Sequence, residues 1–379
     1  MIVVHIGLLS HYTDGMSYQD NSLAEMNAKE GHTVIFITDI HRYENGMLVE
    51  TEEEDVVLNN GIRLIRLKYD NICNSFITNK IQKASKLKKL LEDIKPDSIM
   101  YHGVCGFELM DVAKYVKKNP GVLFYMDSHE DFNNTARNCI SKVAYKYIHG
   151  LFVMKARKYV KKVLYITKET KEYLQEMYNF SEEELEFYPL GGIIQSKEKQ
   201  LEDRKYLVKQ LNLNEDVIIC GHSGKLDKLK KTEDLLNAFN NINDERLVLI
   251  IWGMIPENQK KVLTPLIERD KRVFFLGWKN SEESTKLMNA VDLYCQPGSQ
   301  SISSQAALCC GCAEMLFPHS SYTDFYKNIA YYVREKKDME VIFRKILLNR
   351  EGFNDKKEET IEFAKKNLAY SKLSERYLS

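Results

Sequence analysis

Short apolar runs and stretches of helical spacing alternate along the whole chain. In the first half, runs of strand length are separated by patterns of helical period. The run at 2–8 is apolar throughout, which is typical of a central parallel strand, whereas 62–67 alternates like an edge strand. The expected strands of this series are 2–8, 33–38, 62–67, 98–101, 122–126, 163–167 and 185–190.

A second series of the same kind follows, with expected strands at 217–220, 247–251, 273–276, 293–295, 315–317 and 329–333. Two consecutive β/α series predict an α/β fold with two doubly wound parallel-sheet domains. Gly191 and Gly192 mark the expected hinge, because a charged and weakly patterned segment begins shortly after them. We expect the first domain at 1–192, the second at 193–359, and a C-terminal helix at 360–379 that completes the first.

Local signals predict the ends of some elements. Ser22 and Glu25 have the spacing of a helix capping box, and Gly31 would end that helix. Another helix is expected at 76–94, and the acidic segment 52–55 is expected to be a solvated loop.

Composition limits the classes of partner and the compartment. The 379 residues carry 54 basic and 54 acidic side chains, so no net field favours nucleic acid. No apolar run approaches the length of a membrane span, and residues 1–9 lack a charged leader and a cleavage site. Eight cysteines without an export signal favour a reducing cytoplasm. The spacing of Cys309, Cys310 and Cys312 straddles a helix end, so we expect no metal there.

A loop rich in hydroxyl groups follows the expected strand 293–295. Pro297 and Gly298 end that strand, polar residues continue to 304, and helix-forming residues resume at Gln305. Unpaired N–H groups and the helix dipole at such a start favour an anion, most often a phosphate. The alternative is a serine-capped helix without a ligand, and this stretch alone does not decide between them.

Polar residues also collect after other expected strands, where ligands bind in parallel α/β sheets. The loop 222–231 has lysines on both sides of a glycine turn, so it could clamp a diphosphate or be a solvated basic loop. Segment 126–131 sets a histidine among three acids, which suits a sugar hydroxyl, a general base, a metal or a simple surface ion pair. The loop 11–15 is either a ligand contact or an Asp-Gly turn. No P-loop motif occurs, which argues against a P-loop kinase or ATPase.

Residues 142–162 combine lysine and arginine with aromatic and aliphatic side chains. Such a segment could lie on an anionic membrane, at the inner face of the plasma membrane. It could equally be a helix whose apolar stripe packs on the sheet, which is the preferred interpretation.

The order of several short motifs resembles the GT-B glycosyltransferases, in particular the retaining, family-four-like group that uses nucleotide-sugar donors. The motifs run over nearly the whole chain: Gly15, 29–34, 95–97, His129, 188–192, 223–226 with Lys230, 275–278 and 305–311. The resemblance implies two Rossmann-like domains facing a central cleft. The first would take the acceptor and the second the nucleotide-sugar donor.

The resemblance also assigns roles to individual residues. Lys225 and Lys230 would hold the donor diphosphate, and His129 would contact a hydroxyl of the donor sugar; these are the expected catalytic residues. The expected acceptor contacts are His11, Asp14 and Asp131. The other expected donor contacts are Gly15, Ser223, Gly224, Trp252, Trp278, Gly298, Ser299, Gln300, Ser301 and Gln305.

The chain departs from the family pattern in two ways. The family's two glutamates are both missing, with Gln305 at the position of the second, and Lys225 stands where the family has an arginine. An amide can still bond a ribose hydroxyl, and a lysine can still bind phosphate, although without the two-pronged geometry of arginine.

We expect a cytoplasmic enzyme that transfers a sugar from a nucleotide-diphosphate sugar, with UDP favoured, to a glycan or lipid-linked acceptor in polysaccharide or glycoconjugate synthesis. The resemblance implies retention of configuration, with no cofactor and no catalytic metal. The missing glutamates also motivate a catalytically silent partner subunit. A nucleotide-sugar epimerase is a third hypothesis, for which only His129 and the nearby acids could supply acid and base.

Overall fold

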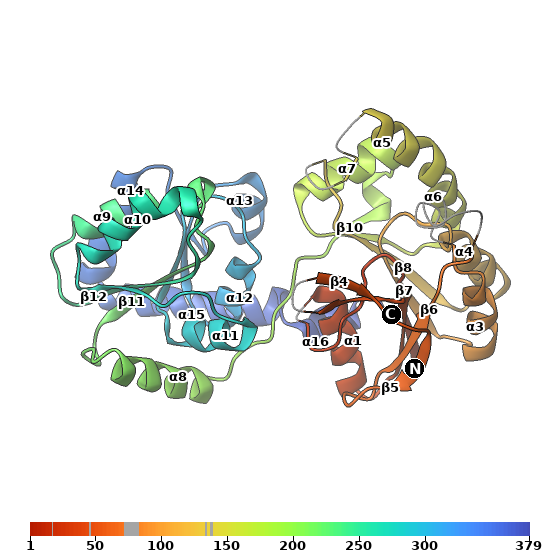
Figure 1. Ribbon diagram of the computed structural model, residues 1–379, viewed down its shortest axis with the longest axis horizontal. Coiled ribbons are helices and arrows are strands. Elements are labelled where there is room, and N and C mark those ends of the chain that lie inside the picture. Colours follow the sequence, from red (N-terminus) through yellow and green to blue (C-terminus); the bar gives the residue numbers. More distant parts are fainter. Residues whose placement is uncertain (17, 45–46, 72–82, 133–134, 137–138) are drawn as a thin grey trace. The chain divides into compact units, whose positions relative to one another are not determined.

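The computed structural model describes residues 1–16, 18–44, 47–71, 83–132, 135–136 and 139–379. They form two compact units, which are Met1–Pro189 with Tyr370–Ser379, and Leu190–Ala369 (Figure 1). The observed division therefore falls after Pro189, where 192 was expected. The helix α15, Arg350–Asn367, lies in the second unit, so the chain returns to the first unit only at Tyr370 and not at 360.

The first unit is built on a sheet of eight strands with helices against it (Figure 1). Its order is β10-β9-β8-β7-β1-β2-β6-β5, and all neighbours are parallel except β5 and β6. The parallel strands follow the Rossmann order, in which the direction of strand addition reverses between β1 and β7. The strands are β1 (Ile2–Gly7), β2 (Thr33–Asp39), β5 (Glu54–Val57), β6 (Arg63–Leu67), β7 (Ser98–His102), β8 (Leu123–Ser128), β9 (Val163–Tyr165) and β10 (Leu185–Phe187).

Two expectations about the edge of this sheet are wrong. The strand β6 pairs with β2 on one side and with β5 on the other, so it is not the edge. The edge is β5, which begins at Glu54 inside the segment expected to be a loop. Because β5 is short and mostly exposed, its sequence lacks the apolar pattern of a buried strand. A separate hairpin, β3 (His41–Glu44) and β4 (Met47–Glu50), follows β2.

The helices of the first unit begin and end differently from the expectation in two places. The helix α1 starts at Gln19 with Tyr18 at its N-cap, so Ser22 lies inside it and forms no capping box. Part of the helix expected at 76–94 lies outside the described residues, and the rest is α3. The described helices are α1 (Gln19–Lys29), α3 (Lys86–Ile94), α4 (Leu109–Lys118), α5 (Cys139–Ala144), α6 (Gly150–Ala156), α7 (Lys168–Tyr178) and α16 (Tyr370–Glu375).

The second unit has a six-stranded sheet that is parallel throughout, in the order β13-β12-β11-β14-β15-β16. This is the Rossmann order again, with its reversal between β11 and β14. The strands are β11 (Ile218–Lys225), β12 (Leu247–Met254), β13 (Val273–Phe275), β14 (Leu293–Gln296), β15 (Ala313–Leu316) and β16 (Tyr331–Tyr332).

The helices of the second unit include one in the charged segment after the expected hinge. This helix, α8 (Lys197–Gln210), is capped by Ser196, whose hydroxyl accepts the N–H of Lys199. The others are α9 (Thr232–Asn240), α10 (Glu257–Glu268), α11 (Ser281–Ala290), α12 (Ser303–Cys309), α13 (Ser320–Tyr326), α14 (Lys336–Leu348) and α15. Among the described residues, no helix has the length and apolar content needed to cross a bilayer.

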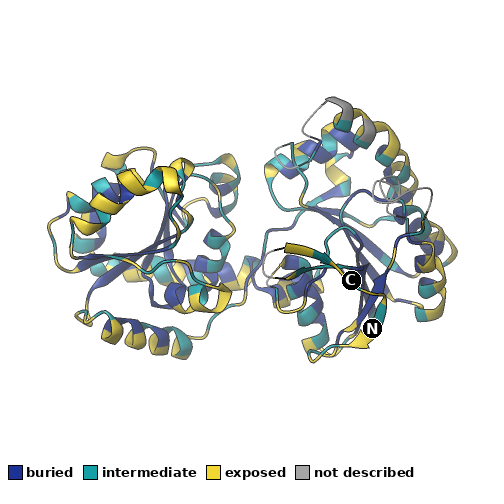
Figure 2. Ribbon diagram, in the orientation of Figure 1, coloured by how far each residue is buried: buried dark blue, intermediate teal, exposed yellow. Residues whose placement is uncertain are grey.

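Each unit has its own buried core, and the central strands of each sheet are buried while many exposed positions collect on the outer faces of the helices (Figure 2). The C-terminal segment is part of the first core, because α16 packs beside α1 (Figure 1). Tyr377 is fully buried, and its hydroxyl donates to Asn27 Oδ1 at 2.7 Å. Ser98 in β7 donates to the carbonyl of Tyr377 at 2.9 Å. These contacts tie the C-terminal segment to α1 and β7 of the first unit.

Candidate active site

The carboxyl ends of β11 and β14 lie side by side where the strand order of the second unit reverses. Such a reversal leaves the crevice in which doubly wound sheets bind ligands. The strand β11 continues to Lys225, five residues beyond the expected end at 220, because His222 and Ser223 have buried partners. The imidazole of His222 contacts the carbonyl of Cys295 at 2.7 Å, and the Ser223 and Tyr294 hydroxyls lie 2.5 Å apart. Burial lowers the pKa of His222 to about 4, so it is neutral at pH 7.

Lys230 lies beside the ends of these strands and is only 8% exposed. It closes the 3-10 turn Lys228–Lys230, which Asp227 caps by accepting the N–H of Leu229 at 3.0 Å. Its ammonium donates to Gln296 Oε1 at 3.1 Å, and it makes no ion pair with the residues that the structure describes. Burial lowers the pKa of Lys230. The site therefore holds a buried cation whose protein partner is a neutral amide.

Gln296 orients this lysine, and the sequence did not single it out. Its side chain is fully buried at the end of β14. Its Nε2 donates toward the carbonyl of Ser223 at 3.2 Å and the hydroxyls of Tyr294 at 3.1 Å and Ser303 at 3.2 Å. The amide therefore keeps its oxygen toward Lys230. The only local signal was an amide at the end of an apolar strand, directly before Pro297.

A pocket of about 340 Å³ lies at the carboxyl ends of β11 and β12. One wall is Trp252, which is buried and donates its indole N–H to Ser284 at 2.9 Å. Trp278, by contrast, exposes 71% of its surface. The pocket brings together Ser223, Gly224, Lys225, Trp252 and Trp278 of the predicted donor contacts, and adds Gly253, Met254, Lys279 and Ser284.

The serine loop, residues 298–302, is held by main-chain contacts. Ser299 donates its N–H to the carbonyl of Leu229 at 2.8 Å, and Ser301 donates its N–H to the hydroxyl of Tyr322 at 2.9 Å. Gln300 donates to the hydroxyl of Ser321 at 2.7 Å. The helix α12 that follows has Ile302 rather than a serine at its N-cap. It begins two residues before the expected start at Gln305, whose Oε1 is buried and accepts no hydrogen bond from the described residues.

The predicted site residues of the first unit lie on two segments, both beyond the carboxyl ends of the strands of its sheet. His11, Asp14 and Gly15 belong to the loop between β1 and α1, and His129 and Asp131 follow β8. One strand, β7, lies between β8 and β1, so the two segments start about 10 Å apart. His129 and Asp14 are exposed.

Beneath these strand ends runs a buried chain of polar side chains that the sequence did not reveal. His102 Nδ1 lies 2.7 Å from Asp127 Oδ2, and His102 Nε2 lies 3.0 Å from His5 Nδ1. Burial lowers the pKa of His5 to about 3, so it stays neutral. Burial opposes charge on the other two as well, but their mutual attraction raises the pKa of His102 and lowers that of Asp127.

Residues 203–366, which span the sheet of the second unit and all of its predicted site residues, match the family model of the glycosyl transferases group 1. The chain has the GT-B fold, and its second unit matches the glycosyl transferases group 1. The resemblance found in the sequence is thereby confirmed, as is the pair of Rossmann-like domains. No curated protein matches the sequence of this chain.

Solved structures similar to this chain include three with sequence identities of 13–16%. A glycosyltransferase from Rickettsia africae has a TM-score of 0.66 and 13% identity over 100% of this chain and 96% of its own. Anabaena HepE in complex with UDP-glucose has a TM-score of 0.62 and 13% sequence identity, and the match covers 100% of this chain and 98% of HepE. WaaG, a glycosyltransferase involved in lipopolysaccharide biosynthesis, has a TM-score of 0.59 and 16% sequence identity, and the match covers 100% of this chain and 98% of WaaG.

Proposed function

We propose that this glycosyltransferase uses a nucleoside-diphosphate sugar, with UDP as the favoured carrier, and transfers the sugar to a glycan or lipid-linked glycan. The observation that carries the proposal is the buried ammonium of Lys230, whose protein partner is the neutral amide of Gln296. A diphosphate would supply the missing negative charge, and each charged hydrogen bond contributes about 1.5–3 kcal/mol. The UDP-glucose complex of HepE supports the choice of carrier.

The pocket beside Lys225 suits the nucleoside of such a donor. Its volume of about 340 Å³ is within the range of small-ligand sites. The buried Trp252 forms a rigid wall, and the exposed ring of Trp278 offers a face on which a base can stack. We assign the base to this pocket, and the diphosphate to Lys225, Lys230 and the serine loop.

In the proposed reaction the bond between the anomeric carbon and the diphosphate oxygen breaks, and a bond to an acceptor oxygen forms. The two lysines stabilise the charge that develops on the leaving diphosphate, a task that needs no metal in this step. The diphosphate takes the proton of the acceptor hydroxyl on the same face, so the configuration is retained. His129 would hold a hydroxyl of the donor sugar.

A surface on the first unit fits a lipid-linked acceptor. Within the segment expected to be amphipathic, Val153 and Ala156 are buried in the core, so one stripe does pack on the unit. A second apolar stripe is exposed and lies among basic side chains. It consists of Val143, Tyr147, Ile148, Leu151 and Met154, with Lys142, Lys146, Lys155 and Lys158. We propose that this basic apolar face rests on an anionic membrane.

Binding of UDP tests the donor site. Wild-type protein should bind UDP in calorimetry, and Lys230→Met or Lys225→Ala should weaken it by roughly 10- to 100-fold. Lys228→Ala is the matched control, because it removes an exposed lysine from the same turn and should leave affinity unchanged. Equal affinities for all four proteins would overturn the assignment of the diphosphate.

Turnover separates the possible reactions. With an acceptor, transfer releases UDP and gives a product whose anomeric configuration reports retention. A donor sugar changed without an acceptor would instead indicate an epimerase, and tight UDP binding without turnover would favour a silent subunit. Sedimentation with anionic vesicles tests the membrane contact: Leu151→Ser should reduce binding, whereas Val341→Ser, an exposed position in the second unit, should not.

A further inference from the structure

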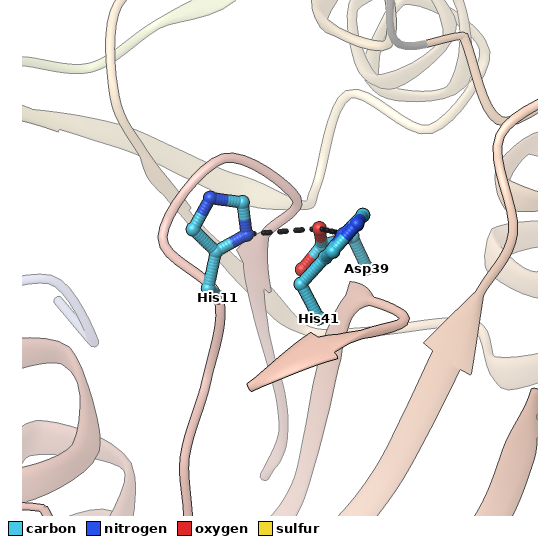
Figure 3. Close-up of side chains that lie close together, drawn as sticks. All are labelled: His11, Asp39 and His41. Carbon is cyan, nitrogen blue, oxygen red and sulfur yellow. Dashed lines mark hydrogen bonds and ion pairs between the residues drawn. The ribbon is translucent and has the colours of Figure 1, made fainter. Parts of the chain in front are cut away.

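Three side chains with metal-binding atoms converge at the carboxyl end of β2 in the first unit (Figure 3). His11 lies in the loop after β1, Asp39 is the last residue of β2, and His41 is the first of β3. Both imidazoles direct Nδ1 at the same carboxylate oxygen, Asp39 Oδ2, at 2.9 Å from His11 and 2.6 Å from His41. We propose that His11, Asp39 and His41 bind a divalent transition-metal ion, with Zn²⁺ as the best fit, and leave one position open to a water or hydroxyl ligand.

The charge of Asp39 favours a cation at this point. Its side chain is fully buried, whereas those of His11 and His41 are 23% and 25% exposed. No lysine or arginine side chain pairs with the carboxylate among the described residues, and its other oxygen, Oδ1, accepts no hydrogen bond from them. The nearby Tyr69 hydroxyl gives its proton to the carbonyl of Leu8 at 2.5 Å. A buried carboxylate without a cation is costly, and a bound metal ion would compensate it.

A buried arginine fixes the backbone that carries all three side chains. One terminal nitrogen of Arg66 donates to the carbonyls of Asp39 and His41, both at 3.1 Å. The other donates at 2.9 Å to the carbonyl of Tyr12, the residue next to His11. Because the guanidinium uses these donors on main-chain oxygens, it orders the cluster without neutralising its carboxylate. Such outer contacts hold metal ligands in place and commonly set the affinity.

The donor set selects the kind of ion. Two imidazole nitrogens and one carboxylate oxygen suit Zn²⁺ and similar transition metals, whereas Mg²⁺ and Ca²⁺ prefer oxygen ligands throughout. Ligand atoms about 2.0–2.1 Å from a tetrahedral ion lie about 3.3 Å apart. Entry of the ion would therefore move Nδ1 away from Oδ2 by about 0.4 Å for His11 and about 0.7 Å for His41, which the partly exposed imidazoles can accommodate. Three protein ligands leave a fourth position open, as in zinc sites that activate a water or hydroxyl.

This site is independent of the proposed donor chemistry, because its residues all belong to the first unit and the lysines belong to the second. If the UDP-binding experiments contradicted the proposed donor site, the proposed metal site in the first unit would still stand. The converse also holds, since a metal-free first unit would not affect the binding of UDP by Lys230.

Metal titration tests the proposal on the full chain without an affinity tag. After dialysis against a chelator, wild-type protein should bind one Zn²⁺ at pH 7.5, with a dissociation constant below about 10 µM in competition with a chromophoric chelator, and should not bind Mg²⁺. His41→Gln and His11→Gln should each weaken Zn²⁺ binding by about 100-fold. His32→Gln is the control, because His32 lies in the same unit outside the cluster. Wild-type affinity in both cluster variants, or no saturable binding by wild type, would overturn the proposal.

X-ray absorption at the zinc edge gives a second measurement that needs no variant. The wild-type complex should show nitrogen and oxygen neighbours with the scattering of two imidazoles. Sulfur neighbours would place the ion on cysteines and would refute the assignment to this cluster.

Discussion

Gly298 is a position where one added methyl group should disturb the turn that carries Lys230. A Cβ there would lie 2.1 Å from the carbonyl oxygen of Leu229 and 2.6 Å from the carbonyl carbon of Lys230. Ordinary contact is about 3.5 Å, so the two segments would have to separate by more than an ångström. Both neighbouring atoms belong to the backbone of the turn that carries Lys230. The N–H of Ser299 also donates a hydrogen bond to the carbonyl of Leu229, with 2.8 Å between nitrogen and oxygen. The Gly298→Ala variant must therefore move the turn that places the buried ammonium.

The expected magnitudes follow from these contacts. Overpacking of this kind costs about 1–3 kcal/mol, which lowers the melting temperature of a unit the size of Leu190–Ala369 by roughly 4–8 °C at the middle of that range. If the shifted ammonium loses one charged hydrogen bond to a diphosphate, about 1.5–3 kcal/mol of binding is lost as well. The affinity for UDP should then fall by roughly 10- to 100-fold.

Calorimetric binding of UDP and thermal unfolding measure the two effects. Gly121→Ala is the matched control, because Gly121 has open space around its Cβ position and should tolerate the same methyl group. If Gly298→Ala bound UDP within twofold of wild type and melted within a degree of it, the link between this close approach and the lysine would be refuted.

Two further predictions concern stability. Burial raises the pKa of Glu108 from 4.5 to about 8, so its contribution is complete below pH 4.5 and is lost as the pH rises through 8. Urea unfolding at pH 5 and at pH 8 should show this decline in free energy of unfolding, up to about 3–4 kcal/mol, in wild type but not in Glu108→Gln; parallel profiles would contradict it. Tyr377→Phe should cost about 1 kcal/mol through the lost bond to Asn27, and Tyr377→Ala about 3–5 kcal/mol through the emptied volume. If urea unfolding showed similar losses of unfolding free energy in Tyr377→Phe and Tyr377→Ala, the ring of Tyr377 would not be tightly packed.

The sequence contained enough information for the layered fold because parallel strands buried on both faces leave continuous apolar runs. It failed where polar side chains are buried. The strand β11 was expected to stop at 220, but His222 and Ser223 continue it, and their partners Cys295 and Tyr294 lie more than seventy residues further along the chain. No local pattern contains such a pairing.

The same reason explains which site residues could be predicted. Ser223, Gly224 and Trp252 meet in one pocket because they lie at the carboxyl ends of two neighbouring parallel strands, β11 and β12, which share an edge of the sheet. The role of Gln296 was not visible, because it depends on three acceptors fixed only by the folded chain. His11 was predicted as an acceptor contact, and its convergence with Asp39 likewise became visible only when the fold placed the loop after β1 beside the end of β2.

The return of the chain to its first unit at Tyr370 has a consequence for biosynthesis. The ring of Tyr377 packs edge-on against His5, with ring centroids 5.9 Å apart, so a residue synthesised after the second unit covers one synthesised before it. Domains generally fold as they leave the ribosome, N-terminal first. Here the domain started first is finished last, and a nascent chain arrested before Tyr370 would hold all the early strands with one side still open to chaperones.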